Sequence, residues 1–402
     1  MSEERLVPKL RFSGFTDEWN EVKLCDIATF SKGKGISKND ISDEGCECVR
    51  YGELYTKYGE MIYDIESKTN LDAGELKLSE KNDILIPCSG ETAIDLATAS
   101  CIQKDQVAIG GDITIIKTNQ FAPFVTYYLN QKKTEIAKYA QGVSIVHLYP
   151  KDFKVVNMNI PLINEQKKII ALFEEITKKE QLLESKYKKY QDFKKYLMQQ
   201  IFTQKLRFDF DDEWKQVKLK DIVERVTRKN TNLETDLALT ISAEYGLIDQ
   251  EEFFNKIVAS KSLKNYYLIK NGEFAYNKSY SNGYPYGAIK RLDDYPMGAL
   301  STLYICFKPT AISSNYLKEY FETTFWYKEI YSIAVEGARN HGLLNINVND
   351  FFNTKHLIPP STEEQEKIAD LFKCINSKID AANNDLKLVK NFKKGLLQQM
   401  FV

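Results

Sequence analysis

Apolar residues recur at alternating intervals of four and three over two stretches of the chain, residues 169–201 and 368–400. This spacing is the heptad pattern of a helix that buries one narrow seam against another helix. Only Glu180, Lys194 and Lys393 interrupt the two seams, and neither stretch contains proline. We therefore expect two long helices that pack on each other. The expected core of this helix pair is Ile169, Phe173, Ile176, Leu183, Tyr187, Leu197, Ile368, Phe372, Ile375, Leu386, Val389 and Leu396.

The two helical stretches are copies of one sequence, because residues 164–202 return without a gap as residues 363–401. A second repeat precedes each copy: the run K-L-R-F, D-E-W and V-K-L-x-D-I begins at Lys9 and again at Lys205. The chain is thus two units of one plan, each a globular domain followed by a helix. The expected segments are a first domain at 1–160, a first helix at 161–202, a second domain at 203–358 and a second helix at 359–402.

The order of the segments predicts how the helices pack. A parallel pair would force the second domain to carry the chain back over the whole helix, about 58 Å at ~1.5 Å per residue. An antiparallel pair needs no such return. We therefore expect an α+β protein in which a long antiparallel two-helix coiled coil separates two mixed α/β domains, with a pseudo-twofold internal repeat. Asn164 can cap the first helix, and Ser361 with Glu364, or Thr362 with Gln365, can cap the second.

The interiors of the two domains differ although their edges match. Residues 46–120 show no convincing similarity to residues 241–312. Shared edges and helices predict one framework, and unlike interiors predict a different target for each domain. Short apolar runs at 83–86, 113–116 and 303–307 indicate strands, and the patterns at 124–141 and 315–335 indicate helices.

Composition describes an ordinary globular protein: the 402 residues are 43% hydrophobic and 28% charged, with a net charge of -1. No apolar run approaches the ~18 residues of a membrane span, and the N-terminus lacks a signal-peptide core, so we expect a cytoplasmic protein without a membrane partner. Seven cysteines and three scattered histidines form no zinc pattern, so we expect no metal. The charge balance means that nucleic-acid binding would need local basic surfaces.

Motifs of common catalytic sites are missing from the sequence. It contains no dinucleotide fingerprint, phosphate loop, G-x-S-x-G elbow or H-E-x-x-H pair. It also lacks the Asn or Asp-Pro-Pro-aromatic tetrapeptide with which aminomethyltransferases hold a flipped adenine. We infer that the chain binds a ligand and does not catalyse a reaction.

The best binding candidates are loops that mix basic, amide, hydroxyl and aromatic side chains. Lys and Arg can contact phosphates, Arg can bridge guanine, and Asn or Gln can bridge adenine. A plain surface loop is the alternative at each position. The candidates are Lys32, Lys34, Lys38, Ser89, Thr92, Ser144 and His147 in the first domain, and Arg228, Lys229, Asn277, Lys278, Ser279, Tyr280, Asn282, Tyr284, Arg339, Asn340 and His341 in the second.

The doubled plan resembles the specificity subunit of type I restriction-modification systems over essentially the whole chain. The resemblance rests on the repeated entry motif, the Gly…Asp-Phe…Ile-Pro lead-in and the E-Q-x-K-I-x-x-L-F…F-K-K-x-L-x-Q-Q-x-F helices. It implies two target recognition domains, each reading one half of a split, asymmetric site in double-stranded DNA. It also implies a helical spacer, long enough for roughly 17 base pairs at ~3.4 Å each, on which two modification subunits dock.

The same resemblance assigns the chemistry to partners. The modification subunits would use S-adenosylmethionine to methylate adenine at N6, and restriction subunits would use ATP and Mg²⁺ for translocation and cleavage, so this chain would need no cofactor of its own. Two other classes of function remain open. One is an enzyme with an unrecognised site, such as a solitary nuclease or methyltransferase, and the other is a two-domain coiled-coil scaffold that binds protein or sugar.

Overall fold

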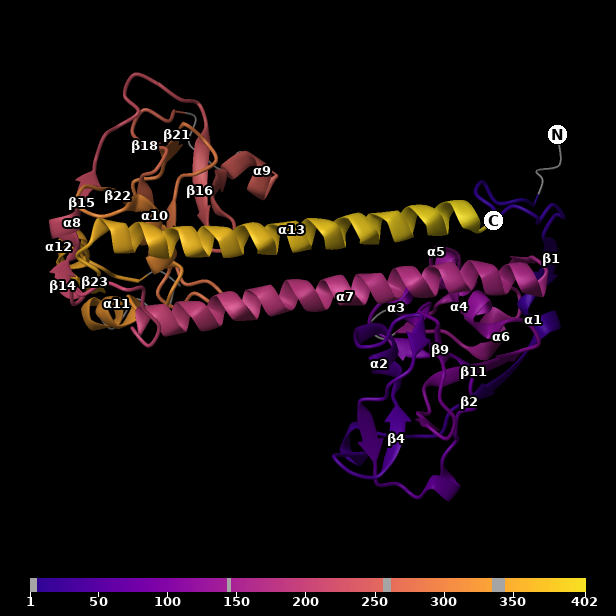
Figure 1. Ribbon diagram of the computed structural model, residues 1–402. Helices are drawn as coiled ribbons and strands as arrows, with labels where there is room; N and C mark the ends of the chain where they lie inside the picture. Colours follow the sequence, from indigo (N-terminus) through magenta and orange to yellow (C-terminus); the bar gives the residue numbers. More distant parts are fainter. Residues whose placement is uncertain (1–5, 143–145, 256–261, 335–343) are drawn as a thin grey trace. The chain divides into compact units, whose positions relative to one another are not determined.

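The computed structural model describes residues 6–142, 146–255, 262–334 and 344–402. The chain divides into two compact units: unit 1 comprises Met1–Ser185 and Asn383–Val402, and unit 2 comprises Lys186–Ala382. Two long helices, α7 (Ile163–Phe202) and α13 (Thr362–Met400), each contribute one half to each unit (Figure 1).

Unit 1 contains a five-stranded sheet in the order β2-β11-β7-β9-β5 and a four-stranded sheet in the order β10-β4-β6-β3. Its elements before α7 are β1 (Asn20–Lys23), α1 (Leu24–Ile27), β2 (Ala28–Lys32), η1 (Lys38–Asp40), β3 (Ile41–Ser42), β4 (Cys46–Val49), α2 (Tyr51–Thr56), β5 (Met61–Ile62), β6 (Ser67–Thr69), η2 (Ala73–Glu75), β7 (Ile84–Pro87), β8 (Ser89–Gly90), α3 (Ala93–Leu96), β9 (Ser100–Ile102), β10 (Ala108–Ile109), β11 (Ile113–Thr118), α4 (Ala122–Gln131), α5 (Lys133–Ile136), η3 (Ala137–Tyr139), β12 (Val146–His147), α6 (Pro150–Phe153) and β13 (Asn157–Ile160).

Unit 2 contains two four-stranded sheets, in the orders β15-β22-β19-β20 and β17-β16-β21-β18. Its elements between the long helices are β14 (Lys215–Lys218), α8 (Leu219–Ile222), β15 (Val223–Val226), β16 (Ala238–Ser242), β17 (Gly246–Asp249), α9 (Gln250–Phe254), β18 (Tyr267–Lys270), β19 (Phe274–Asn277), β20 (Ala288–Arg291), β21 (Met297–Leu300), β22 (Ile305–Pro309), α10 (Ser314–Phe321), α11 (Tyr327–Ile333), α12 (Val348–Asn353) and β23 (Lys355–Ile358).

The repeated sequence forms the same two-stranded joint, next to the start of a long helix, in both units. In unit 1, β1 pairs antiparallel with β13, and in unit 2, β14 pairs antiparallel with β23. The second strand of each pair leads through an Ile-Pro directly into a long helix. The two repeated edges of each domain therefore meet beside the first turn of that helix.

A buried glutamate in that first turn receives an arginine from the entry motif. Arg11 contacts Glu165 through two hydrogen bonds of 2.7 and 2.8 Å, and Arg207 contacts Glu364 through two of 2.8 and 3.0 Å. Such two-point pairing fixes geometry as well as charge. The Arg of K-L-R-F and the Glu of E-Q-x-K-I are therefore two halves of one contact, which explains why they repeat together.

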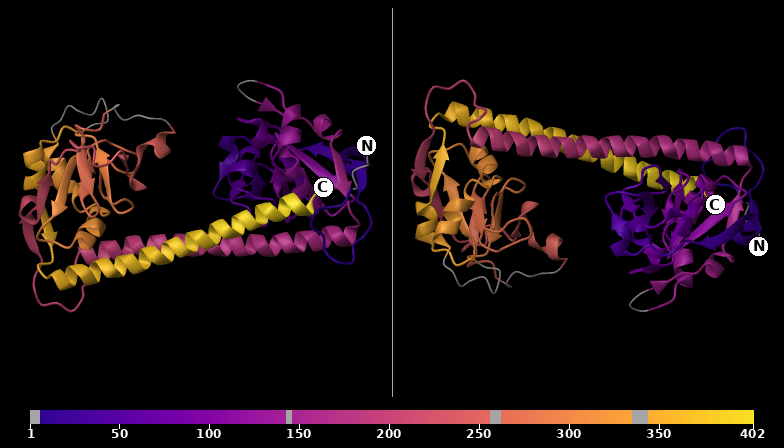
Figure 2. Two further views of the ribbon diagram at one scale, coloured as in Figure 1. Left: turned by 90° about the horizontal axis from the view of Figure 1, so that it is seen from above. Right: turned by 90° about the horizontal axis from the view of Figure 1, so that it is seen from below.

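Phe202, the last residue of α7, and Phe401, which directly follows α13, lie among aromatic rings of the opposite repeat. The Phe202 ring lies 6.2 Å from Trp214 and 6.2 Å from Phe372, which is near the start of α13. The Phe401 ring lies 6.0 Å from Phe173, near the start of α7. Within each unit the two helices therefore run antiparallel, and Figure 2 shows this from two further sides. The expected α+β fold with an antiparallel helix pair is confirmed.

The polar residues that interrupt the seams are paired. Lys393 Nζ lies 3.5 Å from Glu180 Oε2 and 3.6 Å from Glu60 Oε2. Lys194, the repeat partner of Lys393, lies 3.7 Å from Glu319 Oε2 on α10. Each of the two seam lysines is therefore satisfied partly by an acid from the globular part of its own unit.

The expected seam residues at the beginnings of the two helices are buried, and burial is mixed over the rest of the pair. Among them, those that are half-buried are Leu183, Tyr187, Val389 and Leu396. Those that are buried are Ile169, Phe173, Ile176, Leu197, Ile368, Phe372, Ile375 and Leu386. The globular domains cover the ends, which adds burial there.

Three local expectations were wrong. Asn164 does not cap the first helix, because α7 already begins at Ile163, whereas Ser361 Oγ accepts from Glu364 N at 3.3 Å and caps α13 as expected. The pattern at 124–141 is not one helix, because α4 ends at Gln131 and the backbone of Lys132 (φ -91°, ψ 10°) leaves the helical region before α5. Likewise the pattern at 315–335 is divided between α10 and α11. The expected strands at 83–86, 113–116 and 303–307 correspond to β7, β11 and β22.

Phe202→Ala should lower the free energy of unfolding by about 3–5 kcal/mol, because it removes a buried ring from an aromatic core. Phe193→Ala on the same helix is the matched control, since that ring is 49% exposed, and it should change stability by less than about 0.5 kcal/mol. Denaturant titration of both variants measures the difference. Equal losses would show that α7 is not anchored by its last aromatic residue.

His356 gives unit 2 a sensitivity to acid. It is buried on β23, where Tyr320 Oη lies 2.9 Å from Nδ1 and Thr354 Oγ1 lies 2.8 Å from Nε2. Burial lowers its pKa from 6.5 to about 4. The folded state therefore favours the neutral ring. The stability that depends on this neutral ring is fully present above pH 6.5 and is lost as the pH falls towards 4. The corresponding residue of β13 in unit 1, opposite Val22, is Met158.

His356→Met should flatten the dependence of stability on pH. In the wild type, the free energy of unfolding should fall by about 1.4 kcal/mol for each pH unit of acidification between pH 6.5 and about 4, because of this histidine. The variant loses the hydrogen bonds to Tyr320 and Thr354, so the slope of stability with pH, and not the absolute stability, is the measurement. An unchanged slope in urea titrations would contradict the assignment.

Candidate nucleic-acid interface

Three loops that the sequence singled out meet around Tyr149 in unit 1. β12 pairs with β8, and His147 Nδ1 lies 3.1 Å from Ser89 Oγ. The His147 ring stacks on Tyr149 with centroids 6.0 Å apart and planes at 15°. Lys32 Nζ and Lys151 Nζ lie 5.4 and 5.8 Å from the centroid of the Tyr149 ring. We call Lys32, Ser89, His147, Tyr149 and Lys151 the Tyr149 cluster.

A close backbone contact holds the loop that follows Lys32. Gly33 N donates to Ile113 O at 3.0 Å, and a Cβ on Gly33 would lie only 2.0 Å from Gly110 O. A side chain at position 33 would therefore push the loop away from its neighbour. Lys32 is at the end of β2, and the tight contact after it keeps this strand end in place.

The Tyr149 cluster has the chemistry of a nucleic-acid surface. Two ammonium groups can contact phosphates, and a hydroxyl and an imidazole can hydrogen-bond base edges. The His147 and Tyr149 rings are both accessible in part, so either can stack or pack on a nucleotide. Tyr149 and Lys151 were missed in the sequence, although the run Tyr149-Pro150-Lys151 directly follows the selected loop and was the available signal.

The other candidates of unit 1 fall into three groups. Lys34 is exposed on the loop after β2, and Lys38 is exposed at the start of η1. Thr92 is occupied as the cap of α3, since its Oγ1 accepts from Asp95 N at 3.2 Å. Ser144 lies outside the described residues. Lys34 and Lys38 remain available for phosphate contacts, whereas Thr92 has a structural role.

In unit 2, the candidates 277–284 form the connection between β19 and β20. Gly287 ends it with φ +78°, and a Cβ there would lie 2.1 Å from Asn277 O. Asn277 Oδ1 accepts from Ser279 N at 3.0 Å, which shapes the turn from inside. Tyr280 is 60% exposed, and Asn282 is also exposed. Of the remaining candidates here, Lys278, Ser279 and Tyr284 are half-buried.

Arg228 and Lys229 do not join this hairpin. Arg228 Nη2 lies 2.8 Å from Glu273 Oε2, and Glu273 is buried just before β19, at the end of the strand opposite the hairpin loop. Lys229 Nζ donates to Asn265 O at 2.9 Å and lies 4.1 Å from the centroid of the Tyr267 ring. Arg339, Asn340 and His341 lie outside the described residues. The chain resumes at Leu344, whose N donates to Lys278 O at 3.0 Å.

Tyr245 is a further exposed aromatic residue that the sequence analysis missed. It is 64% exposed in the turn before β17. Burial raises the pKa of Tyr284, and the carboxylates of Glu322 and of Glu244, the residue before Tyr245, raise it further. Nothing in the local sequence distinguished this tyrosine, which lines a cavity together with residues of β20.

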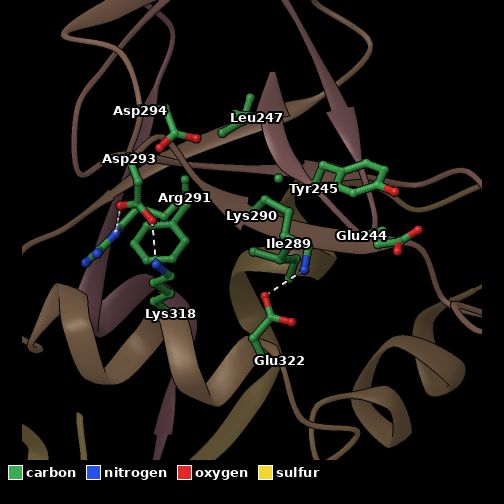
Figure 3. A pocket seen from close by; sticks show the side chains of 12 residues that line it. Glu244, Tyr245, Leu247, Ile289, Lys290, Arg291, Asp293, Asp294, Lys318 and Glu322 are labelled. Atoms are coloured by element: carbon green, nitrogen blue, oxygen red, sulfur yellow. Dashed lines mark hydrogen bonds and ion pairs between the residues drawn. The ribbon is translucent and has the colours of Figure 1, made fainter. Parts of the chain in front are cut away.

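Behind Tyr245 lies a cavity of about 280 Å³ with a charged lining (Figure 3). Asp293 pairs with Arg291 and with Lys318, each at 2.6 Å, and Lys290 Nζ pairs with Glu322 Oε1 at 2.6 Å. These pairs join β20 and the turn after it to α10. The lysine and arginine charges of the lining are therefore already used inside the protein, and we assign this cavity no ligand.

The described residues bring together no group of three or more His, Cys, Asp or Glu side chains that could hold a metal ion. Within the same residues, no helix combines the length and the apolar character needed to cross a membrane.

Comparison with known proteins identifies the framework. Residues 16–190 match the family described as "Type I restriction modification DNA specificity domain". The chain is 21% identical over 409 residues to the "Type I restriction enzyme MjaVIII specificity subunit" of Methanocaldococcus jannaschii, covering 95% of this chain and 91% of the relative.

Two solved structures share the fold. One is the S subunit of a type I restriction-modification system from M. genitalium, with a TM-score of 0.62 and 16% identity over 98% of this chain and 99% of that one. The other is a chain from a study of complex assembly and conformational transition of the type I R-M system, with a TM-score of 0.55 and 15% identity over 96% and 98% of the two chains. Residues 16–190 therefore match a type I restriction modification DNA specificity domain, and the chain shares the fold of these two solved structures over nearly its whole length.

Proposed function

We propose that each unit reads one half of a bipartite, asymmetric DNA site. The observation that carries this proposal is that the same joint supports two different exposed surfaces. Unit 1 presents the Tyr149 cluster with its two lysines, whereas unit 2 presents Tyr245, Tyr280 and Asn282. Unlike side chains at a base edge select unlike sequences, so the two half sites should differ.

We further propose that the helix pair sets the spacing of the half sites and docks two modification subunits. Several residues that repeat identically are exposed, so packing within the chain does not require their identity: Phe193 and Phe392, Lys195 and Lys394, and Gln199 and Gln398. A repeated exposed surface is what two copies of one partner would need. This chain would then be a non-catalytic subunit.

The reaction would belong to the partners. Modification subunits would bind S-adenosylmethionine and methylate adenine at N6, and restriction subunits would bind ATP and Mg²⁺. The absence of the common catalytic motifs from the sequence supports this division. Methyl transfer to duplex DNA by the purified chain alone would contradict it.

The first test varies the two half sites separately in a binding assay with the assembled methyltransferase. Lys32→Ala should weaken binding to all sequences, because it removes one phosphate contact. The slope of the logarithm of the binding constant against the logarithm of the salt concentration should decrease in magnitude by about 1. His147→Ala should relax discrimination at one half site by about 1–3 kcal/mol and leave the other unchanged. Tyr139→Ala, at a tyrosine that is 44% exposed outside the cluster, is the control. If His147→Ala relaxed sequence discrimination at both half sites, the proposal that each unit reads one half site would be contradicted.

The second test concerns unit 2. Asn282→Ala and Tyr280→Ala should relax only the half site that His147→Ala leaves unchanged. Arg228→Ala should instead lower stability by about 1 kcal/mol, since it leaves the Glu273 carboxylate without its arginine partner in a partly exposed pair. Binding assays and urea titration of the same three variants separate recognition from structure. A change in sequence preference without loss of stability in Arg228→Ala would reverse its assigned role.

A further inference from the structure

The exposed faces of the long helices carry equivalent stripes with different chemistry. Intervals of three, four and three residues place the members of each stripe on one face of a helix. The α7 stripe is Lys186, Lys189, Phe193 and Tyr196, and its counterpart in the repeat, the α13 stripe, is Asp385, Leu388, Phe392 and Gly395. Phe193 and Tyr196 are 49% and 58% exposed, and Leu388 and Phe392 are 67% and 58% exposed.

Unit 1 extends the α13 stripe into an apolar patch. Lys390 Nζ contacts Glu184 Oε1 at 2.5 Å on one flank of the helix pair. Leu388 and Phe392 are each two positions from Lys390, or about 200° around the helix, so they face the opposite flank. Leu182 is two positions from Glu184, so it also faces away from the flank of the ion pair, and it is 71% exposed. In the antiparallel pair, Leu182 lies level with Phe392. Leu182, Leu388 and Phe392 thus present three adjacent exposed apolar side chains.

Unit 2 offers a different surface at the equivalent place. The stacking of Phe202 on Phe372 sets the register in this unit and puts Ala381 level with Phe193. The repeat therefore replaces Leu182 by Ala381 and Leu388 by Lys189. Lys186 and Lys189 are exposed, and Lys186 Nζ approaches the Tyr190 ring at 6.0 Å. The α7 stripe carries two positive charges where the α13 stripe carries one negative charge and a leucine.

We propose that the two modification subunits are held unequally: one by apolar contact on the α13 stripe, the other through Lys186 and Lys189 on the α7 stripe. This inference rests on the proposed function, which places the same partner at both stripes. One partner surface cannot match both charge patterns. An acidic and apolar partner surface fits the α7 stripe at low salt, whereas on the α13 stripe it is held by Leu182, Leu388 and Phe392. Salt screens the first contact and spares the second.

The test titrates the purified modification subunit of the same system into this chain and measures stoichiometry by analytical ultracentrifugation. Two copies should bind at about 50 mM NaCl, and at about 500 mM NaCl the second copy should bind at least about tenfold more weakly than the first. The double variant K186D/K189L, which installs the first two residues of the α13 stripe, should retain both copies at high salt. D385K/L388K should make both copies salt-sensitive.

Lys188→Ala is the matched control, because Lys188 is exposed on the same helix but outside the stripe, and it should leave the salt profile unchanged. Thermal unfolding should confirm that all variants fold as the wild type does. Two copies with the same salt dependence, or a K186D/K189L profile equal to wild type, would overturn the inference and leave the proposed function standing. Failure of either copy to bind at any salt concentration would overturn both.

Discussion

The structure depends on one kind of contact: Phe202, at the end of α7, and Phe401, directly after α13, pack into the domain of the opposite repeat. Phe202 joins Trp214 and Phe372, and Phe401 joins Trp19 and Phe173. Each core is thus built from one domain, the beginning of one helix and the end of the other. A helix that is fixed at both of its ends by cores cannot slide along its partner, and the seam between the helices inherits this register.

The seam itself is more polar than a coiled coil needs for stability. Lys393 and Lys194 occupy core positions, and acids of the globular parts, Glu60 and Glu319, help to satisfy them. A buried ion pair contributes little net stability, because desolvation opposes the attraction, but a displaced register would leave each lysine without its partner. These two lysines therefore favour one alignment of the helices and one placement of each domain on its own helix ends.

The charge of the chain is organised locally. A net charge of -1 gives no general attraction to DNA, yet Lys32 and Lys151 gather on Tyr149, and Lys186 and Lys189 follow one face of α7. In unit 2, by contrast, Lys290, Arg291 and Lys318 are neutralised by neighbouring acids. What distinguishes a binding surface here is whether a basic side chain has an internal partner, and the number of lysines alone does not show this.

The sequence by itself determined the doubled plan, the two long helices, their antiparallel packing and the family resemblance. These features depend on periodicity, on repetition and on the length of chain between the helices. All three can be read directly along the chain without knowing which distant residues are in contact. Only the tertiary structure decided which candidate residues meet. Ser89 and His147 are brought together by the pairing of β8 with β12, and Tyr245 lines one cavity with residues of β20. Arg228 resembled a DNA contact in the sequence, but the fold places the buried Glu273 beside it. Contacts between distant strands depend on long-range pairing, which the pattern within any one segment does not encode.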